Sequence, residues 1–482
     1  MTETPLLDDS ELAAQTARQS PMRGDLTQGP VARTLLLFAL PTLGSNVLQS
    51  LNGSISAIYV GKFLGENAFA AAGIANMVMF LIFASVFGLA MAATIMIGQA
   101  MGRRDIAEVR RTIGATSGTF IAVSLVFAAL GGMIVPPLLR LLATPEAAFP
   151  FAASFLEVVF YGVPFVFLTV LLQSAMRGVG DAVTPLWATV LNLVLSLVIN
   201  PIFILGWGPV PAMGLPGAAW AGVVTNAICL VFMIVRTYTL DLPIRLRGPE
   251  LRLLLPDWAH LKPVLTIGVP MGLSMVIMAM SALVMTGLIN REGVDTVAAY
   301  NAANQLWSYI QMPAFAIASA VSAMAAQNIG AGRWDRIAML ARAGVATNVV
   351  MTGVLVVAML LADHFLLGLF LPLGSKAIGI AEHIDLLIGW TFVPMGISMV
   401  MTSIVRANGA VVLPFVILVF SVIIVRMSVG FGLYPGFGAD AIWWAFMASG
   451  AASAIMSVAY YLHGSWRRIG PLAPHAMPIS AE

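Results

Sequence analysis

Long apolar stretches, separated by short polar or charged turns, follow one another along almost the whole chain. Each is long enough to cross the roughly 30 Å hydrocarbon core of a bilayer as a helix. We expect transmembrane helices at residues 34–60, 67–100, 107–139, 150–176, 182–206, 214–238, 262–289, 295–326, 337–361, 378–405, 411–433 and 440–464. The pattern therefore predicts an all-α membrane protein with twelve transmembrane helices.

Short motifs recur in this pattern at a constant distance. The pairs are GQAMGRRD with QNIGAGRWD, MRGVGDAVTP with VRANGAVVLP, and two apolar segments that each open with a proline. Gln99 and Gln327 are 228 positions apart, and Pro41 and Pro270 are 229 apart. A constant offset in separate motifs indicates a tandem duplication. Paired halves in a membrane protein commonly place a substrate site between them and move one half against the other.

The duplication divides the chain into two lobes of six helices, an N-lobe at 31–238 and a C-lobe at 262–466. An amphipathic linker at 239–261 is expected to lie along the membrane surface. Residues 1–30 and 467–482 read as polar cytoplasmic tails, the first without the apolar core of a signal peptide. Because each lobe has an even number of helices, a pseudo-two-fold axis along the membrane normal should relate them.

Composition agrees with a membrane protein. The chain has 482 residues, of which 60% are hydrophobic and 10% charged, and its mean hydropathy is +0.94; a soluble domain is about a quarter charged. The single cysteine, Cys229, excludes an intrachain disulfide. With both termini on one side, that side holds 19 Lys and Arg residues, the other side holds 4, and Arg426 lies inside a helix. This bias predicts cytoplasmic termini.

Signatures of catalysis are missing from the sequence. No phosphate-binding loop is present, so ATP hydrolysis within this chain is not expected. The five histidines show no metal-ligand spacing. We therefore expect no enzyme, no cofactor, no metal site and no nucleic-acid partner.

Several further motifs occur in a fixed order along the chain. They are ALP at 39–41, AIYVGKFLG at 57–65, GQAMGRRD at 98–105, MRGVGDAVTP at 176–185, NPIFILG at 200–206, GLPGAAWA at 214–221, AAYNAANQ at 298–305 and VRANGAVVLP at 405–414. With the two halves and the twelve helices, they resemble the multidrug and toxic compound extrusion (MATE) family of antiporters over about residues 30–465. The resemblance implies a V-shaped pair of six-helix bundles around a central cavity that opens alternately to either side. It implies multidrug efflux of amphipathic or cationic organic compounds in exchange for H⁺ or Na⁺, through a bacterial inner membrane.

The chain departs from this family at the coupling residues. Four positions that carry a carboxylate in one branch or another are Ser56, Asn200, Met278 and Met395 here. Serine and asparagine do not titrate near neutral pH, although their oxygens can coordinate Na⁺ or bind a substrate. The sequence therefore leaves open whether H⁺ or Na⁺ drives transport.

Polar residues at helical spacing mark a candidate site in the N-lobe. The first helix carries one such stripe and the fifth helix another, each on a single face. The two stripes are Gln49, Asn52 and Ser56, and Asn192, Ser196 and Asn200. We predict that they face each other and line a substrate or ion site. The alternative is ordinary helix packing, in which small polar residues are common.

The eighth helix carries a second group of polar side chains. The resemblance places Asn301 and Gln305 in the wall of the cavity, and Asn304 and Tyr309 extend the same region. The alternative is a polar packing seam between helices.

Arg426 is an isolated charge inside the eleventh helix and needs a partner or water there. Candidate partners are Asp385 and Glu157. One hypothesis is a coupling ion pair that protonation breaks, so that H⁺ is exchanged through one of these acids. The alternatives are a static pair, snorkelling of the arginine, or Na⁺ coupling through neutral oxygens.

Two other functions compete with drug export. A flippase for a lipid-linked precursor would need a cationic cavity, and Arg426 is the only deep cation in the sequence pattern. A non-transporting scaffold or sensor would not need two polar stripes. For the favoured function we expect small-molecule drugs or organic cations and the lipid bilayer as partners, and a monomeric chain.

Overall fold

The computed structural model describes residues 24–469 except 142, 143, 145, 147, 208–210, 256 and 373. Within these residues, twelve helical segments are long and apolar enough to cross a membrane, as predicted. The helices are α2 (Val31–Gly102), α3 (Ile106–Leu141), α4 (Phe149–Gly178), α5 (Val183–Pro201), α6 (Leu215–Thr239), α7 (Trp258–Ile289), α8 (Val294–Gly330), α9 (Trp334–Leu367), α10 (Lys376–Ile388), α11 (Phe392–Ala407), α12 (Val412–Val419), α13 (Arg426–Phe437) and α14 (Ala439–His463).

The first two predicted helices form one element, α2, rather than two separated by a break. A straight helix of its 72 residues would be about 108 Å long. Yet both of its ends lie beside Gln327: the Leu26 amide donates to Gln327 Oε1 at 2.9 Å, and a Cβ added to Gly102 would lie 2.0 Å from the Gln327 carbonyl oxygen. The element therefore doubles back, and its two spans are Val31–Leu64 and Ala71–Gly102.

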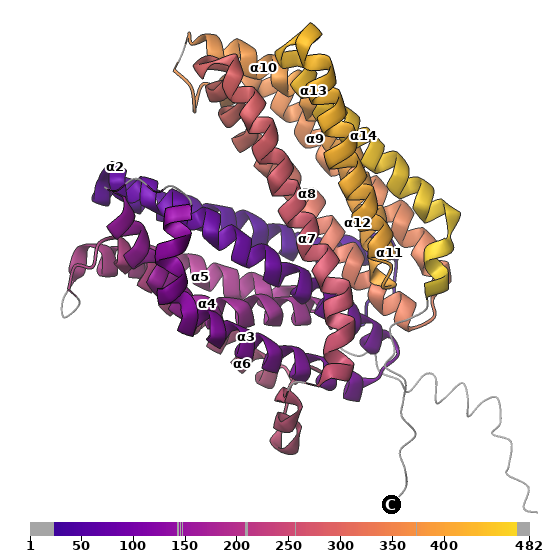
Figure 1. Cartoon of the computed structure of the whole chain (residues 1–482). Helices are drawn as coiled ribbons and strands as arrows, with labels where there is room; N and C mark the ends of the chain where they lie inside the picture. Colours follow the sequence, from indigo (N-terminus) through magenta and orange to yellow (C-terminus); the bar gives the residue numbers. More distant parts are fainter. Residues whose placement is uncertain are drawn as a thin grey trace, which may run out of the picture.

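Two helix bundles diverge from a shared end in the shape of a V (Figure 1). Helices α2 to α6 form the N-lobe, and α7 to α14 form the C-lobe. We call the shared end the closed end and the opposite end the open end. At the closed end α2 packs against the C-lobe helices α7 and α8; Met96, for example, lies in one buried cluster with Ile267 and Met271. A second shared cluster joins Leu35 and Phe38 of α2 to buried residues of α8, α9 and α11. Two further large apolar clusters lie within the N-lobe and within the C-lobe.

Three short interruptions break the spans into shorter helices. A π-helical turn, η1 (Ile202–Gly206), continues α5, and a second, η5 (Phe420–Val425), joins α12 to α13 directly before Arg426. The 3₁₀ turn η4 (Gly389–Thr391) joins α10 to α11. Such turns inside α-helices release backbone groups from regular pairing and are frequent at functional sites.

The predicted linker crosses to the N-lobe and packs on α3. Its 3₁₀ helix η2 (Gly248–Leu254) approaches so closely that a Cβ added to Gly118 would overlap the Leu254 carbonyl oxygen. Glu250 forms an ion pair with Arg110 of α3. The backbone amide of Arg247, and then the Arg110 side chain, lower the pKa of the Glu250 carboxyl.

Residues 24–30, the last part of the predicted N-terminal tail, contact the C-lobe. They form a strap across the closed end, where Arg336 donates through Nη2 to the Gly29 carbonyl at 3.0 Å and Asn328 donates to the Leu26 carbonyl at 3.3 Å. The C-lobe side chains supply the partners that an extended backbone needs. The remaining tail residues, 1–23 and 470–482, lie outside the described residues.

Candidate functional site

The two polar stripes of the N-lobe meet, as the spacing predicts. Asn52 of α2 donates through Nδ2 to Asn192 Oδ1 of α5 at 2.9 Å. About two helical turns further along α2, toward the open end, the Tyr59 hydroxyl donates to the Leu197 carbonyl at 3.5 Å. The helices run in the same direction, so the residues of each stripe stack in the same order.

Within this N-lobe site, the amides are only partly satisfied. Oδ1 of Asn52 is buried and has no hydrogen-bond partner among the described residues. Asn200 bonds its own helix at the Ser196 carbonyl, 2.9 Å away, so it does not meet Ser56 through a hydrogen bond in the described part of the chain. An unused buried oxygen is costly unless a cation, water or substrate donor fills the position.

Gln49 differs from its neighbours because its side chain is exposed, whereas Ser196 and Asn200 are buried. The stripes therefore contain an outer part, available to a ligand, and an inner part packed against helices. The site assignment itself stays a prediction.

On the C-lobe, one face of α8 carries exposed polar side chains at membrane depth. Tyr309 is 41% exposed, and Asn301, Asn304 and Gln305 are exposed as well. A polar packing seam would bury these groups against another helix, so their exposure argues against that alternative. Because amides facing hydrocarbon are unfavourable, such a face belongs beside water or a polar ligand.

Among the described residues, Arg426 forms no ion pair with an acid, in contrast to the ion pair considered from the sequence. Its Nε donates to Ser449 Oγ at 3.0 Å and its Nη1 to Ser281 Oγ at 3.4 Å. Its guanidinium lies 4.5 Å from the centre of the Phe446 ring. Hydroxyl groups and an aromatic face therefore stabilise the charge in place of a carboxylate.

The two acids proposed as its partners lie elsewhere. Glu157 is exposed on α4, in the other lobe. Asp385 is fully buried on α10, and it accepts a hydrogen bond from the indole Nε1 of Trp307 at 2.5 Å. Asp363 of α9 also lies beside it.

Asp363 is a residue that the sequence reasoning missed. The predicted ninth helix ended at residue 361, which placed Asp363 in an exposed turn. The structure extends α9 to Leu367 and buries Asp363. No feature of the sequence connects this acid with Asp385.

In the C-lobe, methionines occupy the two positions at which the resemblance led us to look for a carboxylate. Met278 is 39% exposed on α7, and Met395 packs against the C-lobe core. Among the described residues, no group of three His, Cys, Asp or Glu side chains is arranged to hold a metal ion.

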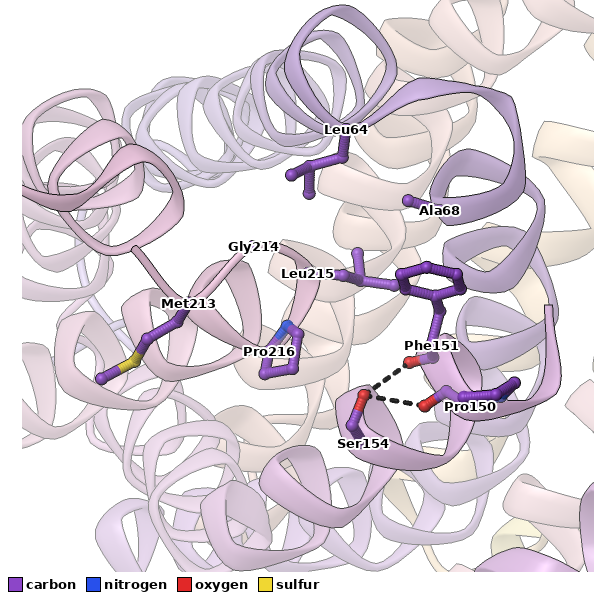
Figure 2. A pocket seen from close by; sticks show the side chains of 9 residues that line it. All are labelled: Leu64, Ala68, Pro150, Phe151, Ser154, Met213, Gly214, Leu215 and Pro216. Atoms are coloured by element: carbon purple, nitrogen blue, oxygen red, sulfur yellow. Dashed lines mark hydrogen bonds between the residues drawn. The ribbon is translucent and has the colours of Figure 1, made fainter. Parts of the chain in front are cut away.

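A shallow apolar pocket of about 340 Å³ lies away from these groups (Figure 2). Its walls come from the reversal of α2 and the starts of α4 and α6: Leu64, Ala68, Pro150, Phe151, Ser154, Met213, Gly214, Leu215 and Pro216. Its one hydroxyl, on Ser154, donates to carbonyls of its own helix. The pocket therefore offers no polar side chain to orient a ligand.

Twelve spanning helices in two repeated lobes, with polar groups on facing helices at membrane depth, define a multi-pass membrane transporter. The MatE family model matches residues 41–202 and again 270–431, one match in each lobe. The chain belongs to the MatE family and is a transporter rather than an enzyme.

Related proteins extend over almost the full length. The chain is 31% identical to "Probable multidrug resistance protein YoeA" of Bacillus subtilis over 433 residues, which cover 89% of this chain and 93% of that protein. It is 23% identical to "Probable multidrug resistance protein NorM" of Thermotoga maritima, over 91% of this chain and 94% of the relative. A crystal structure of MATE in complex with MaL6 has the same fold, with a TM-score of 0.84, 18% identity, and coverage of 93% of this chain and 99% of the other.

Proposed function

We propose that this protein is a secondary multidrug exporter that moves amphipathic or cationic organic compounds out of the cytoplasm in exchange for H⁺ or Na⁺. The observation that carries the proposal is the exposed amide face of α8, which includes Asn301 and Gln305. This face belongs to the C-lobe. The N-lobe, which diverges from it, contains Asn52, whose side-chain oxygen has no hydrogen-bond partner among the described residues. Both lobes thus present neutral polar groups at membrane depth, and neutral amides suit varied substrates better than a fixed anion. The names of the relatives agree with this function.

Alternating access supplies the mechanism. The lobes are packed together at one end and diverge at the other. Arginines gather at the closed end, including Arg103, Arg177 and Arg406, and the positive-inside rule places such an end in the cytoplasm. On this orientation the structure is the outward-facing state, in a bacterial inner membrane with cytoplasmic termini. Export requires the closed end to open and the lobes to meet at the other end.

Purified protein in liposomes tests the proposal. A fluorescent organic cation such as ethidium is followed after either a pH gradient or a Na⁺ gradient is imposed, each at matched membrane potential. We expect one gradient to drive uptake against the cation gradient in liposomes with the protein, and neither to do so in empty liposomes. If neither gradient drives flux of cationic, zwitterionic or neutral probes, the exporter proposal fails.

An additional pair of variants connects flux with the α8 face. Asn301→Leu with Gln305→Leu removes two exposed amides without opening a core cavity, because neither side chain is packed. Transport should fall at least tenfold while the melting temperature stays near that of the unaltered protein. Replacement of an exposed apolar residue on a lipid-facing helix, Val354→Leu on α9, is the matched control and should leave flux unchanged.

A further inference from the structure

Two buried carboxyl groups meet in the C-lobe, on helices that the sequence repeat did not connect with ion binding. Asp363 on α9 is 6% exposed and Asp385 on α10 is 0% exposed. Their side chains are placed to hydrogen-bond each other. Oδ1 of Asp363 and Oδ2 of Asp385 are buried and receive no hydrogen bond from any donor among the described residues. Trp307 occupies the remaining side of Asp385 through its indole N–H.

Simple electrostatics dictates the protonation state of such a pair. Two ionised carboxylates in contact repel strongly in a medium of low dielectric constant. Carboxylates are also acceptors only, so two of them cannot hydrogen-bond each other. One shared proton removes the repulsion and supplies the missing donor, as in other carboxyl dyads. The pair therefore holds one proton in the conformation described.

We propose that Asp363 and Asp385 form the proton-exchange site of this transporter. This inference rests on the proposed exporter function and assigns its coupling ion as H⁺. The proton is held between the two carboxyl oxygens in the outward-facing state and is released to the cytoplasm when the pair becomes exposed to the other side. Binding of the organic cation and binding of the proton then exclude each other, which is the requirement for exchange.

The surroundings distinguish this pair from a structural ion pair. Glu382 on α10 and His364 on α9 act electrostatically on Asp363. The same end of helices α8, α10 and α14 also carries Asp295, Tyr300, Lys376, His383 and Asp440. Arg426 on α13 interacts with Tyr300. No Lys or Arg forms an ion pair with either aspartate in the described residues. A carboxylate pair without a fixed cation depends on a proton for neutrality, whereas a static pair would have an arginine or lysine beside it.

Two exposed pairs, each of a histidine and a carboxylate, lie on the side of this pair that faces the open end. His364 Nδ1 lies 2.8 Å from Glu382 Oε1, and His383 Nε2 lies 2.9 Å from Asp440 Oδ1. All four of these side chains are exposed at more than a third of their surface. The two exposed pairs can pass protons between the external water and the buried carboxyl groups.

Helix α8 connects the carboxyl pair with the contact between the lobes. Trp307 bonds Asp385, and Gln327, 20 residues further along α8 and about 30 Å away, lies at the closed end. Pro313 lies between them inside the same helix, where the missing amide permits a change in bend. Loss of the shared proton alters the partner of Trp307, and α8 carries that change toward the closed end.

The experiment measures ethidium affinity against pH for the full-length protein in detergent. If proton and cation compete, the apparent Kd falls as pH rises, by up to tenfold per pH unit where the pair titrates. Asp363→Asn and Asp385→Asn each keep a donor between the two side chains and preserve volume. Both should fold, lose this pH slope and lose flux driven by a pH gradient. Asp295→Asn, at an exposed acid on α8 at the same end, should keep both.

A second variant guards against a folding defect in the asparagine substitutions. Trp307→Phe removes the indole donor to Asp385 and keeps an aromatic ring in the core. It should shift the midpoint of the affinity curve to higher pH while keeping its slope. Retention of the normal slope and of pH-driven flux in both asparagine variants would overturn the inference. Flux driven by Na⁺ alone would also overturn it and leave the exporter standing. Absence of gradient-driven flux in the unaltered protein would instead reject the exporter.

Discussion

Gln99 and Gln327 make the same contact in opposite directions across the two lobes. Gln99 of the N-lobe donates through Nε2 to the carbonyl of Ala407, the last residue of α11, at 2.7 Å. Gln327 of the C-lobe donates to the carbonyl of Gly178, the last residue of α4, at 3.0 Å. Gly178 and Ala407 are 229 positions apart, as the repeat requires. The duplication thus supplies a symmetric pair of side-chain bonds that hold the closed end together.

Removing either glutamine should shift the lobes away from this closed arrangement. A hydrogen bond of this kind contributes about 1 kcal/mol. Gln99→Ala should therefore lower, roughly fivefold, the ratio of molecules in which the lobes are packed together at this end to molecules in which they have separated there. Spin labels at Arg111 of α3 and Met339 of α9 report the separation of the lobes by pulsed electron resonance. We expect a growing long-distance population. An unchanged distance distribution would show that Gln99 does not hold the lobes together.

Gln327→Ala should have the larger effect of the two. Besides the bond to Gly178, its Oε1 accepts from the Leu26 amide at 2.9 Å, and its amide lies 3.3 Å from the Gly24 carbonyl. The variant therefore loosens the strap as well as the interlobe contact. Proteolysis of the strap region should be faster in Gln327→Ala than in Gln99→Ala, and equal rates would contradict the difference between the repeats.

Glycines beside these glutamines permit the close approach of α2 and α8. A Cβ added to Gly102 would lie 2.0 Å from the Gln327 carbonyl oxygen, and a Cβ added to Gly330 would lie 2.0 Å from the Gln99 carbonyl oxygen. Neither backbone can yield by rotating a side chain. Gly102→Ala and Gly330→Ala should each hold the closed end apart, at a cost of about 1–3 kcal/mol to the closed state, and reduce transport at least tenfold.

Gly53, on the same helix as Gly102, is the matched control because no heavy atom lies within 4 Å of its Cβ position. Gly53→Ala removes backbone freedom in the same way and should leave both transport and the spin-label distances unchanged. A loss of transport in Gly53→Ala equal to that in Gly102→Ala would show that helix flexibility, and not the close approach, is what matters.

The twelve spans and the two-lobe arrangement were predictable because each follows from local apolar length and from a constant offset. The meeting of Asn52 with Asn192 was predictable from two observations. Spacing fixes which residues share a helix face, and both stripes fall where the resemblance places an ion site. Contacts between helix faces without such a guide were not predictable. Arg426 contacts two serines and an aromatic ring because the packing of α13 on α14 determines its neighbours. A single sequence does not specify that packing.

The pair of Asp363 and Asp385 could not be predicted from the sequence for the same reason and for a second one. Asp385 was a candidate only as a partner for Arg426, and Asp363 fell just beyond a helix end that hydropathy placed too early. Charged residues lower the local hydropathy and so shorten the predicted span at the position where function requires a buried charge. The error is therefore systematic at sites of this kind.

Attachment of the linker to α3 should depend on pH. The lowered pKa of Glu250 in the folded protein means that its contribution to stability is present above its ordinary value and is lost as pH falls through the lowered one. The linker should therefore remain attached on acidification to about pH 4.5, the reference value for glutamate, and detach below it. The line shape of a spin label at Leu251 measures detachment of the linker. Arg110→Gln should move detachment to higher pH. An identical pH profile in this variant would show that the ion pair between Arg110 and Glu250 does not hold the linker.

The Asn52–Asn192 contact should serve transport more than folding. Asn192→Leu removes the acceptor for Asn52 Nδ2 and leaves both polar atoms of Asn52 without a partner, which costs about 1–3 kcal/mol; Asn52→Leu together with Asn192→Leu should recover part of that stability, since no unpaired amide remains. Transport should stay at least tenfold reduced in the double variant.

Asn226→Leu is the control for this comparison. Asn226 lies in the same lobe, and within the described part of the chain its amide bonds only its own helix, at the Gly222 carbonyl 2.9 Å away. Flux per folded molecule and melting temperature, measured for all four variants including Asn52→Leu alone, separate the two roles. If the double variant recovered flux together with stability, the Asn52–Asn192 contact would serve only the packing of the two helices.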